Sequence, residues 1–434
     1  MFTLNPKLPL IQQADVKGKT VLVRVDHNVV KKGKIKDAFR IDSSLGTIIN
    51  ILGRGGKPIL MTHVGRPYDK KTNTYTMDSD SDISPIVAYL EKKLCCKIGI
   101  VSPPAPAAGQ GMTLDEQTRE KALKELNSGA VQLLYLPNTR LFVGEESKGP
   151  ERQVFARSLA KFGDLYVNDA FGSWQPHATT YDITSYLPSY AGFLLQAELM
   201  NLGDVLEPKK PFMAVVAGSK YDTKIGPVTA LYEQADYLML GGVVYNTYLC
   251  AKYGINIEGV GADDIELAKK LVEMDRSQGR VVEMDYIVES QSMERKDGQF
   301  RTVKISDLKA GDSLKLVLDV APESMAQPEV KKVIESAQTI FTNAVMGLVP
   351  GFGEGSQALY TAIMNNKSAR KMFGGGDTLE QIKKLTPAAY MKALEDPSAY
   401  FFTGGGSVLT ALEQRSAYGL EPVKALLAGG AAPM

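Results

Sequence analysis

The feature that most constrains this sequence is the regular alternation of short apolar runs with longer segments of helical periodicity. Residues 20–25, 58–62, 131–136 and 165–167 are apolar runs of strand length. Such alternation is typical of βαβ units, which build a largely parallel sheet covered by helices. Because 434 residues exceed what one hydrophobic core usually fills, two domains are expected. We therefore predict an α/β protein with two doubly wound parallel-sheet, Rossmann-like domains.

The same rhythm resumes in the second half of the chain. An apolar helix from about Ala191, closed by prolines before residue 211, is predicted to connect the two domains. Further strands are predicted within 237–240, 281–288, 314–320 and 339–342. Segments 371–379 and 401–409 look like copies of one unit, in which an aromatic strand end, three glycines and a polar N-cap precede a helix.

Composition excludes several functional classes. With 50 basic and 49 acidic side chains the net charge is +1, so no general attraction to nucleic acid or to anionic lipid is expected. No apolar stretch reaches the length of a membrane span, and the N-terminus lacks a signal-peptide pattern. The three cysteines lack metal-ligand spacing, which indicates a reducing compartment. We expect a cytoplasmic protein.

Polar side chains follow successive strands of the first half. Asp26 and Asn28 follow the first strand, His63 and Arg66 the second, and Arg140 the third. Since the carboxyl ends of parallel strands face one crevice, these groups are predicted to share a cleft that suits a small phosphorylated carboxylate. The alternative is that each arginine is an ordinary surface residue and that His63 is a satisfied loop histidine.

A phosphate site is predicted where the buried run 212–217 meets Gly218, Lys220 and Lys224. Glycine permits close approach of an anion, helix amides point at it, and the lysines supply charge. The alternative is a plain βα turn with solvated lysines. The glycine triplets extend this site, but neither a P-loop nor a complete G-x-G-x-x-G fingerprint is present. Asp377 is either a Mg²⁺ ligand or a helix N-cap.

Seven short blocks together make the chain resemble the phosphoglycerate kinase family over nearly its whole length. They are V-R-V-D-H-N-V from residue 23, T-H-V-G-R-P from 62, G-D-L-Y-V-N-D-A-F-G from 163, G-S-K-Y-D-T-K-I from 218, L-D-V-A-P-E-S from 318, G-G-G-D-T from 374 and T-G-G-G from 403. Their number and order make the resemblance specific.

The resemblance implies a 3-phosphoglycerate-binding domain at 1–190, a hinge helix and linker at 191–210, a nucleotide-binding domain at 211–415, and a segment at 416–434 that returns to the first domain. It implies the glycolytic phosphoryl transfer between 1,3-bisphosphoglycerate with ADP and 3-phosphoglycerate with ATP, with Mg²⁺. Only these small-molecule partners are expected, and the protein is expected to be a monomer.

Residue roles follow from the matching positions. Arg40 and Lys220 are implied to be catalytic, and because they lie on separate domains, hinge closure is expected to assemble the site. Substrate contacts are implied for Asp26, Asn28, Arg40, His63, Arg66 and Arg140; nucleotide contacts for Gly218, Lys220, Lys224, Gly242, Asn343, Gly347, Asp377 and Thr378; backbone donors to the phosphate for Gly375, Gly376, Gly404 and Gly405; and a metal ligand for Asp377.

Some positions depart from the family pattern. Gln175, in a loop that is one residue short, stands where a substrate-binding arginine belongs. Pro350 replaces a glutamate that contacts the ribose, for which Glu354 is a candidate substitute. His27 replaces a phenylalanine for no reason visible in the sequence. Two functions therefore stay open: an active phosphoglycerate kinase, or a weakened relative kept as a binding or structural component. A Rossmann oxidoreductase is a third alternative, which the missing glycine fingerprint disfavours.

Overall fold

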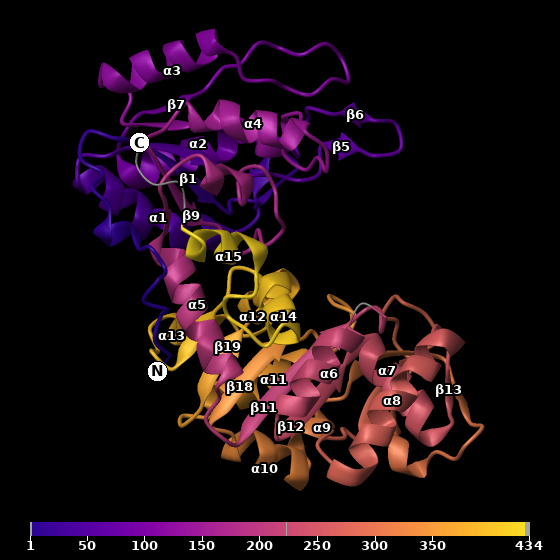
Figure 1. Ribbon diagram of the computed structural model, residues 1–434. Helices are drawn as coiled ribbons and strands as arrows, with labels where there is room; N and C mark the ends of the chain where they lie inside the picture. The colour runs from indigo at the N-terminus through magenta and orange to yellow at the C-terminus, as the bar shows by residue number, and fades with distance from the viewer. Residues whose placement is uncertain (1, 223, 430–434) are drawn as a thin grey trace. The chain divides into compact units, whose positions relative to one another are not determined.

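The computed structural model describes residues 2–222 and 224–429, which divide into two compact units (Figure 1). Among the described residues, the N-terminal unit comprises 3–200 and 418–429, and the C-terminal unit comprises Phe2, 201–222 and 224–417. Helix α5 (Phe193–Leu206) begins in the first unit and ends in the second. Each unit is built on a parallel sheet with helices, so the predicted α/β fold class is confirmed.

The N-terminal unit contains a six-stranded sheet in the order β10-β9-β1-β4-β8-β7, and every neighbouring pair is parallel. All six residues of the inner strand β1 are buried, which explains why apolar side chains predominate in it. The four strands predicted in this half are confirmed. The strands are β1 (Thr20–Val25), β4 (Lys57–Met61), β7 (Ile98–Ile100), β8 (Leu133–Tyr135), β9 (Leu165–Asp169) and β10 (Ser189–Ala191).

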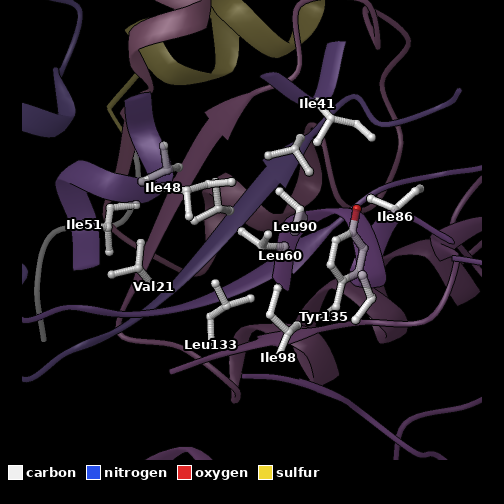
Figure 2. Close-up of a cluster of buried hydrophobic side chains, with 14 of the residues drawn as sticks. Val21, Ile41, Ile48, Ile51, Leu60, Ile86, Leu90, Ile98, Leu133 and Tyr135 are labelled. Carbon is white, nitrogen blue, oxygen red and sulfur yellow. The ribbon is translucent and has the colours of Figure 1, made fainter. Parts of the chain in front are cut away.

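Helices α1 (Phe39–Gly53) and α2 (Ser84–Leu94) bury their apolar stripes in a core on one face of this sheet (Figure 2). Ile48 and Leu90 from the helices meet Val21, Leu60 and Leu133 from the strands in the same core. The unit also contains α3 (Glu116–Asn127), α4 (Glu151–Ala160), α15 (Glu421–Leu427), a hairpin of β2 (Val30–Lys31) with β3 (Lys34–Ile35), and a second hairpin of β5 (Tyr68–Asp69) with β6 (Thr74–Tyr75).

The C-terminal unit contains a five-stranded parallel sheet in the order β12-β11-β18-β19-β20. Its strands are β11 (Phe212–Gly218), β12 (Tyr237–Gly241), β18 (Thr339–Asn343), β19 (Arg370–Phe373) and β20 (Ala399–Phe401). Its helices are α6 (Ile225–Gln234), α7 (Gly242–Tyr253), α8 (Ala262–Gln278), α9 (Glu323–Ala326), α10 (Pro328–Ser336), α11 (Glu354–Asn365), α12 (Gly376–Leu385), α13 (Pro387–Leu394) and α14 (Gly405–Glu413).

Two predicted strands do not continue the parallel rhythm. The apolar runs within 281–288 and 314–320 form β14 (Tyr286–Ser290) and β17 (Leu316–Val320), which pair antiparallel with each other. With β15 (Phe300–Lys304) they make a separate three-stranded sheet. Residues 291–299, a polar connection without a helix, join β14 to β15. A parallel pair would need a helical crossover, so these two strands pair antiparallel. A two-stranded sheet of β13 (Asn256–Ile257) and β16 (Ser313–Leu314) completes the unit. Across the described ranges no helix is both long and apolar enough to span a bilayer.

Candidate active site

In the N-terminal unit, a buried carboxylate lies beside an arginine at the end of the central strand. Asp26 follows β1 and is only 2% exposed, and its Oδ2 lies 3.4 Å from Nη1 of Arg40 in the first turn of α1. Within the described structure the other oxygen, Oδ1, is buried without a hydrogen-bond partner. A buried acceptor without a donor is costly, so this oxygen is suited to receive a hydroxyl from a ligand.

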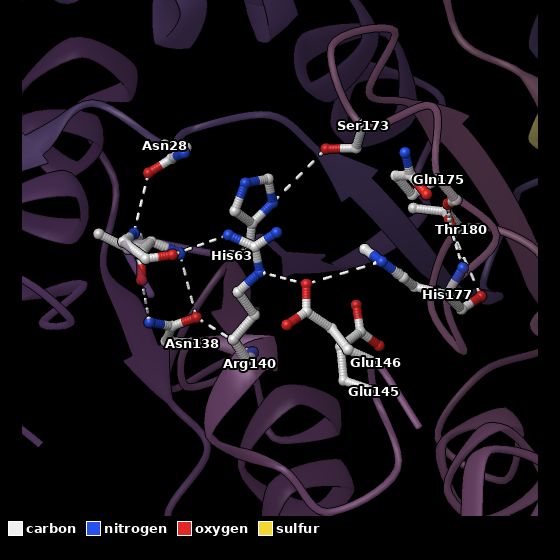
Figure 3. A network of polar contacts seen from close by, with 12 residues as sticks. Asn28, His63, Asn138, Arg140, Glu145, Glu146, Ser173, Gln175, His177 and Thr180 are labelled. Atoms are coloured by element: carbon white, nitrogen blue, oxygen red, sulfur yellow. Dashed lines mark hydrogen bonds and ion pairs between the residues drawn. The ribbon is translucent and has the colours of Figure 1, made fainter. Parts of the chain in front are cut away.

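The loops that follow β1, β4 and β8 meet at the peptide group of Gly65, to which Asn28 and Arg140 are both hydrogen-bonded. Figure 3 labels these two side chains. Asn28 Oδ1 accepts a hydrogen bond from Gly65 N at 2.9 Å, and Arg140 Nη1 donates to Gly65 O at 2.8 Å. Gly65 has φ +61°, and a Cβ there would lie 2.7 Å from Asp80 O, so this position requires glycine. Arg66 comes next and is exposed. The structure therefore brings Asn28 and Arg140, two of the residues predicted to share a cleft, to the same peptide group.

His63 is held as a neutral hydrogen-bond donor by Arg24. The guanidinium of Arg24 lies inside the fold, and its Nη2 lies 3.0 Å from His63 Nδ1. Since arginine can only donate, Nδ1 must accept, and the imidazole proton is on Nε2. Burial, reinforced by the positive charges of Arg24 and Arg140, holds the pKa of His63 well below its usual value of 6.5. His63 thus offers an Nε2–H donor across the working pH range.

Thr179 connects Arg24 to the buried carboxylate of Glu145, which balances the charge of Arg24. The sequence did not predict these three residues as part of the site. Arg24 Nε donates to Thr179 Oγ1 at 2.9 Å, and Thr179 Oγ1 donates to the buried Glu145 at 2.6 Å. Burial raises the pKa of Glu145, while Arg24 and Thr179 oppose that rise. Arg24 stands within an apolar strand, so no local signal marked it as a site residue.

A second carboxylate restrains Arg140. Glu146 Oε1 lies 2.7 Å from Arg140 Nε and 3.6 Å from His177 Nε2 (Figure 3). Burial, together with nearby Arg24 and Arg140, lowers the pKa of His177 to about 3, so this ring is neutral. Glu146 therefore fixes one edge of the Arg140 guanidinium.

Gln175 lies in the loop after β9 and is exposed. Its main-chain carbonyl accepts hydrogen bonds from Thr180 Oγ1 at 2.7 Å and from His177 N at 3.0 Å (Figure 3). Ser173, from the same loop, places its Oγ 3.5 Å from His63 Nδ1. The shortened loop thus contacts His63 with the side chain of Ser173.

In the C-terminal unit, two glycines allow adjacent strands to end in close contact. Gly218 ends β11 and forms a parallel bridge with Gly242 at the start of α7. Gly242 has φ +58°, and a Cβ there would lie 3.0 Å from Gly218 O. Lys220 follows in an exposed turn, and α6 begins only at Ile225. Lys220 is therefore outside the helix, four residues before its N-cap, Lys224.

Asn343 organises the centre of this unit's candidate site. Its Oδ1 accepts a hydrogen bond from Lys224 Nζ at 3.2 Å, and its Nδ2 donates to Gly374 O at 2.8 Å. Burial lowers the pKa of Lys224, while the charge of Asp377 opposes that effect. A Cβ on Gly375 would lie 2.8 Å from Asn343 Nδ2, and one on Gly405 would collide with the Gly375 main chain. The two glycine segments therefore meet around one asparagine.

The helices that follow the glycine segments begin earlier than predicted. The N-caps of α12 and α14 are Gly375 and Gly404, so the predicted polar N-caps at Asp377 and Ser407 are wrong. The chain needs glycine at the cap because Gly375 has φ +104°. Asp377 is in the first turn and exposed, whereas Thr378 behind it is buried. A Cβ on Gly376 would meet nothing within 4 Å, so there is open space beside this helix start.

A buried aspartate supports the glycine-rich loop between β18 and α11. Asp319 Oδ2 accepts a hydrogen bond from Gly355 N at 3.1 Å, and a Cβ on Gly347 would collide with the Asp319 carboxyl. Burial raises the pKa of Asp319 to about 7. Glu354 is already paired with Arg295 at 2.6 Å. Its proposed substitution for the ribose-binding glutamate would require that ion pair to be shared or broken.

The donors present fit a Mg²⁺ ion that is carried by a nucleotide. Among the described residues there is no cluster of three or more histidine, cysteine or acidic side chains that could hold a metal. Mg²⁺ commonly binds through one or two carboxylates together with substrate phosphates, and the exposed Asp377 supplies one carboxylate beside Lys224.

Comparisons with known proteins match nearly the whole length of the chain to phosphoglycerate kinases. The family model for phosphoglycerate kinase matches residues 11–415. The phosphoglycerate kinase of Roseiflexus sp. (strain RS-1) is 35% identical over 411 residues, covering 93% of this chain and 96% of that protein. The cytosolic phosphoglycerate kinase of Triticum aestivum is 34% identical over 411 residues, covering 92% and 94%. The structure of the Coxiella burnetii phosphoglycerate kinase covers 96% of this chain and 98% of its own, with 26% identity and a TM-score of 0.73.

Proposed function

This chain belongs to the phosphoglycerate kinase family, and on that premise we propose that it transfers a phosphoryl group reversibly between 1,3-bisphosphoglycerate with ADP and 3-phosphoglycerate with ATP. The observation that carries the proposal is the buried Asp26 Oδ1, which lacks a partner while its neighbour Oδ2 faces Arg40. A substrate hydroxyl would satisfy this oxygen, and Arg40 would meet an anionic group of the same molecule.

We propose that the N-terminal unit binds the phosphoglycerate. His63 donates Nε2–H, Arg66 and Arg140 attract the anionic groups, and Asn28 orders the loop around Gly65. All of these groups stand at the ends of neighbouring parallel strands. This arrangement suits a small ligand that has an anion at each end and a hydroxyl between them.

We propose that the C-terminal unit binds the nucleotide with Mg²⁺. Lys220, Lys224 and the amides of Gly375, Gly376, Gly404 and Gly405 supply positive potential, and Asn343 holds the glycine segments together. At Gly218, Gly242 and Gly347 a Cβ would meet other protein atoms at 3.0 Å or less, so glycine lets the surrounding segments pack closely at these positions. Asp377, beside Thr378, would hold the metal, which when bound neutralises charge on the transferring phosphates.

For phosphoryl transfer these residues need to hold the two substrates in line and to place positive charge around the transferred phosphoryl group. Phosphoryl transfer passes through a loose transition state that needs little covalent help, so in-line placement and cations around the moving group account for most of the catalysis. Arg40 and Lys220 are the residues to which we assign that charge. The cytosolic wheat relative supports a cytoplasmic location, and we propose that the protein acts there as a monomer.

A coupled assay tests the proposal. Purified protein with MgATP and 3-phosphoglycerate should turn over, and Lys220→Ala should lose most of kcat. Calorimetry should show MgADP binding that Lys220→Ala weakens. Absence of nucleotide binding in the wild type would refute the proposed reaction. Binding of both ligands without turnover would instead favour the weakened relative, consistent with the changes at Gln175 and Pro350.

A further inference from the structure

His27, which replaces a phenylalanine of the family pattern, lies at the centre of a buried polar network. It lies between Asp26 and Asn28 at the end of β1 and is fully buried. Its Nδ1 lies 2.8 Å from the hydroxyl of Tyr135, and its Nε2 lies 2.8 Å from Ser44 Oγ. The ring therefore uses both nitrogens in hydrogen bonds inside the fold.

The proton positions in this network follow from its partners. Ser44 Oγ also lies 2.9 Å from the carbonyl oxygen of Ile41, which can only accept. The single hydroxyl proton of Ser44 goes to that carbonyl, so Ser44 accepts from His27 Nε2–H and His27 Nδ1 accepts from Tyr135. Burial, reinforced by the charge of Arg24, lowers the pKa of His27 to about 3, so the ring stays neutral.

The three elements joined by His27 are those that carry the substrate residues. His27 itself continues β1 between Asp26 and Asn28, and Tyr135 ends β8, which leads to Arg140. Ser44 lies on α1 four residues after Arg40, and residues four apart share a helix face. In Figure 2 the Tyr135 ring lies within the apolar core, and its hydroxyl points toward the end of the core where Ile41 and Ile86 lie.

We propose that His27 is a positioning residue for Arg40, which it places by tying α1 to the end of β1; this role rests on the proposed function. Arg40 meets Asp26 at 3.4 Å, a loose ion pair, so the position of α1 decides where the guanidinium lies. A phenylalanine would fill the space but would form neither hydrogen bond. It would also leave the Tyr135 hydroxyl buried without its acceptor.

Graded substitutions separate the two hydrogen bonds. Glutamine places its amide nitrogen near the position of Nε2 and can keep the bond to Ser44, whereas asparagine places its oxygen near Nδ1 and can keep the bond to Tyr135. We expect His27→Gln to retain kcat within about threefold, and His27→Asn and His27→Phe to lose about tenfold or more, each with the KM for 3-phosphoglycerate changed less than about threefold.

Two controls distinguish positioning from a general loss of stability. Tyr245→Phe removes another buried hydroxyl, which is bonded to the main chain of Met284 in the C-terminal unit, and should lower the unfolding temperature without changing kcat. In an Arg40→Ala background, His27→Phe should cause no further loss of kcat, because the group that it places is absent. Imidazole ¹⁵N shifts of the wild type should show an unprotonated Nδ1 and a protonated Nε2 on His27.

The outcomes that overturn the inference are distinct. An active wild type in which His27→Phe keeps full kcat, or loses the same factor with and without Arg40, would refute the role of His27 alone. A protonated Nδ1 would refute the network. A wild type without any turnover would refute the proposed function and, with it, the positioning role.

Discussion

Asp169 should make the N-terminal unit less stable as the pH rises. This carboxyl ends β9 inside the fold, where its Oδ1 accepts hydrogen bonds from Leu194 N at 2.9 Å and Leu195 N at 3.2 Å in the first turn of α5. Burial raises its pKa from 3.8 to about 7, opposed by hydrogen bonds from Thr47 and these two amides. The folded state therefore binds the proton more tightly than the unfolded state does. The resulting stabilisation is present below pH 3.8 and is lost as the pH rises through 7.

The size of the effect follows from the two pKa values. Ionised Asp169 costs about 4 kcal/mol of stability well above pH 7, of which about 2.5 kcal/mol develops between pH 5 and pH 8. In Asp169→Asn the amide oxygen can still accept from the helix, but the group no longer titrates. The unfolding free energy of the variant minus that of the wild type should therefore rise by about 2.5 kcal/mol over this pH range.

Urea unfolding followed by tryptophan fluorescence measures this difference directly. Trp174 is the only tryptophan of the chain and belongs to the N-terminal unit. Asp115→Asn is a matched control: Asp115 caps α3, where hydrogen bonds from Thr118 lower its pKa, so its contribution is present at neutral pH and lost as the pH falls. The control difference should stay constant between pH 5 and pH 8, because the contribution of Asp115 is lost only at more acidic pH, where its lowered pKa lies. A difference between wild type and Asp169→Asn that stays constant from pH 5 to pH 8 would refute the reasoning.

Three further outcomes are expected. Arg40→Ala should lower kcat at least about tenfold more than it changes the KM for 3-phosphoglycerate, and a pure KM effect in steady-state kinetics would limit Arg40 to binding. Gln175→Arg should tighten 3-phosphoglycerate binding by roughly tenfold in calorimetric titrations while nucleotide affinity stays the same. Equal 3-phosphoglycerate affinity in wild type and variant would contradict the assignment of this loop position to substrate binding. Gly375→Ala should weaken MgADP binding more than Gly376→Ala does. Only Gly375 has a positive φ, +104°, and only the methyl group added there would meet Asn343. Equal MgADP affinities of the two variants would contradict this reasoning.

The sequence predicts those parts of the fold that a short run of neighbouring residues is enough to specify. The parallel strands β1, β4 and β11 are predominantly apolar and are followed at once by polar residues or end in glycine, so both the strand and the chemistry at its end can be recognised. The antiparallel pairing of β14 with β17 could not be predicted in this way, because an apolar run has the same composition whichever direction its neighbour takes.

The missed site residues act over long separations in sequence. Arg24 contacts Thr179 across 155 positions, and a buried arginine within an apolar strand has no local marker. The function of His27 depends on Tyr135 and Ser44, which only the folded sheet brings together. The helix caps were misplaced because the left-handed backbone of Gly375 is set by packing against Asn343.

The segment from Tyr418 to the end of α15 belongs to the N-terminal unit although it is synthesised after the whole C-terminal unit. Its side chains Leu420, Val423 and Leu426 are buried, and the Tyr418 hydroxyl accepts a hydrogen bond from Asn5 N at 2.7 Å. A ribosome makes these residues only after it has made all of residues 201–417, which form the other unit. The unit that emerges first is thus completed last, and until then the apolar surface that α15 covers is exposed on the nascent chain.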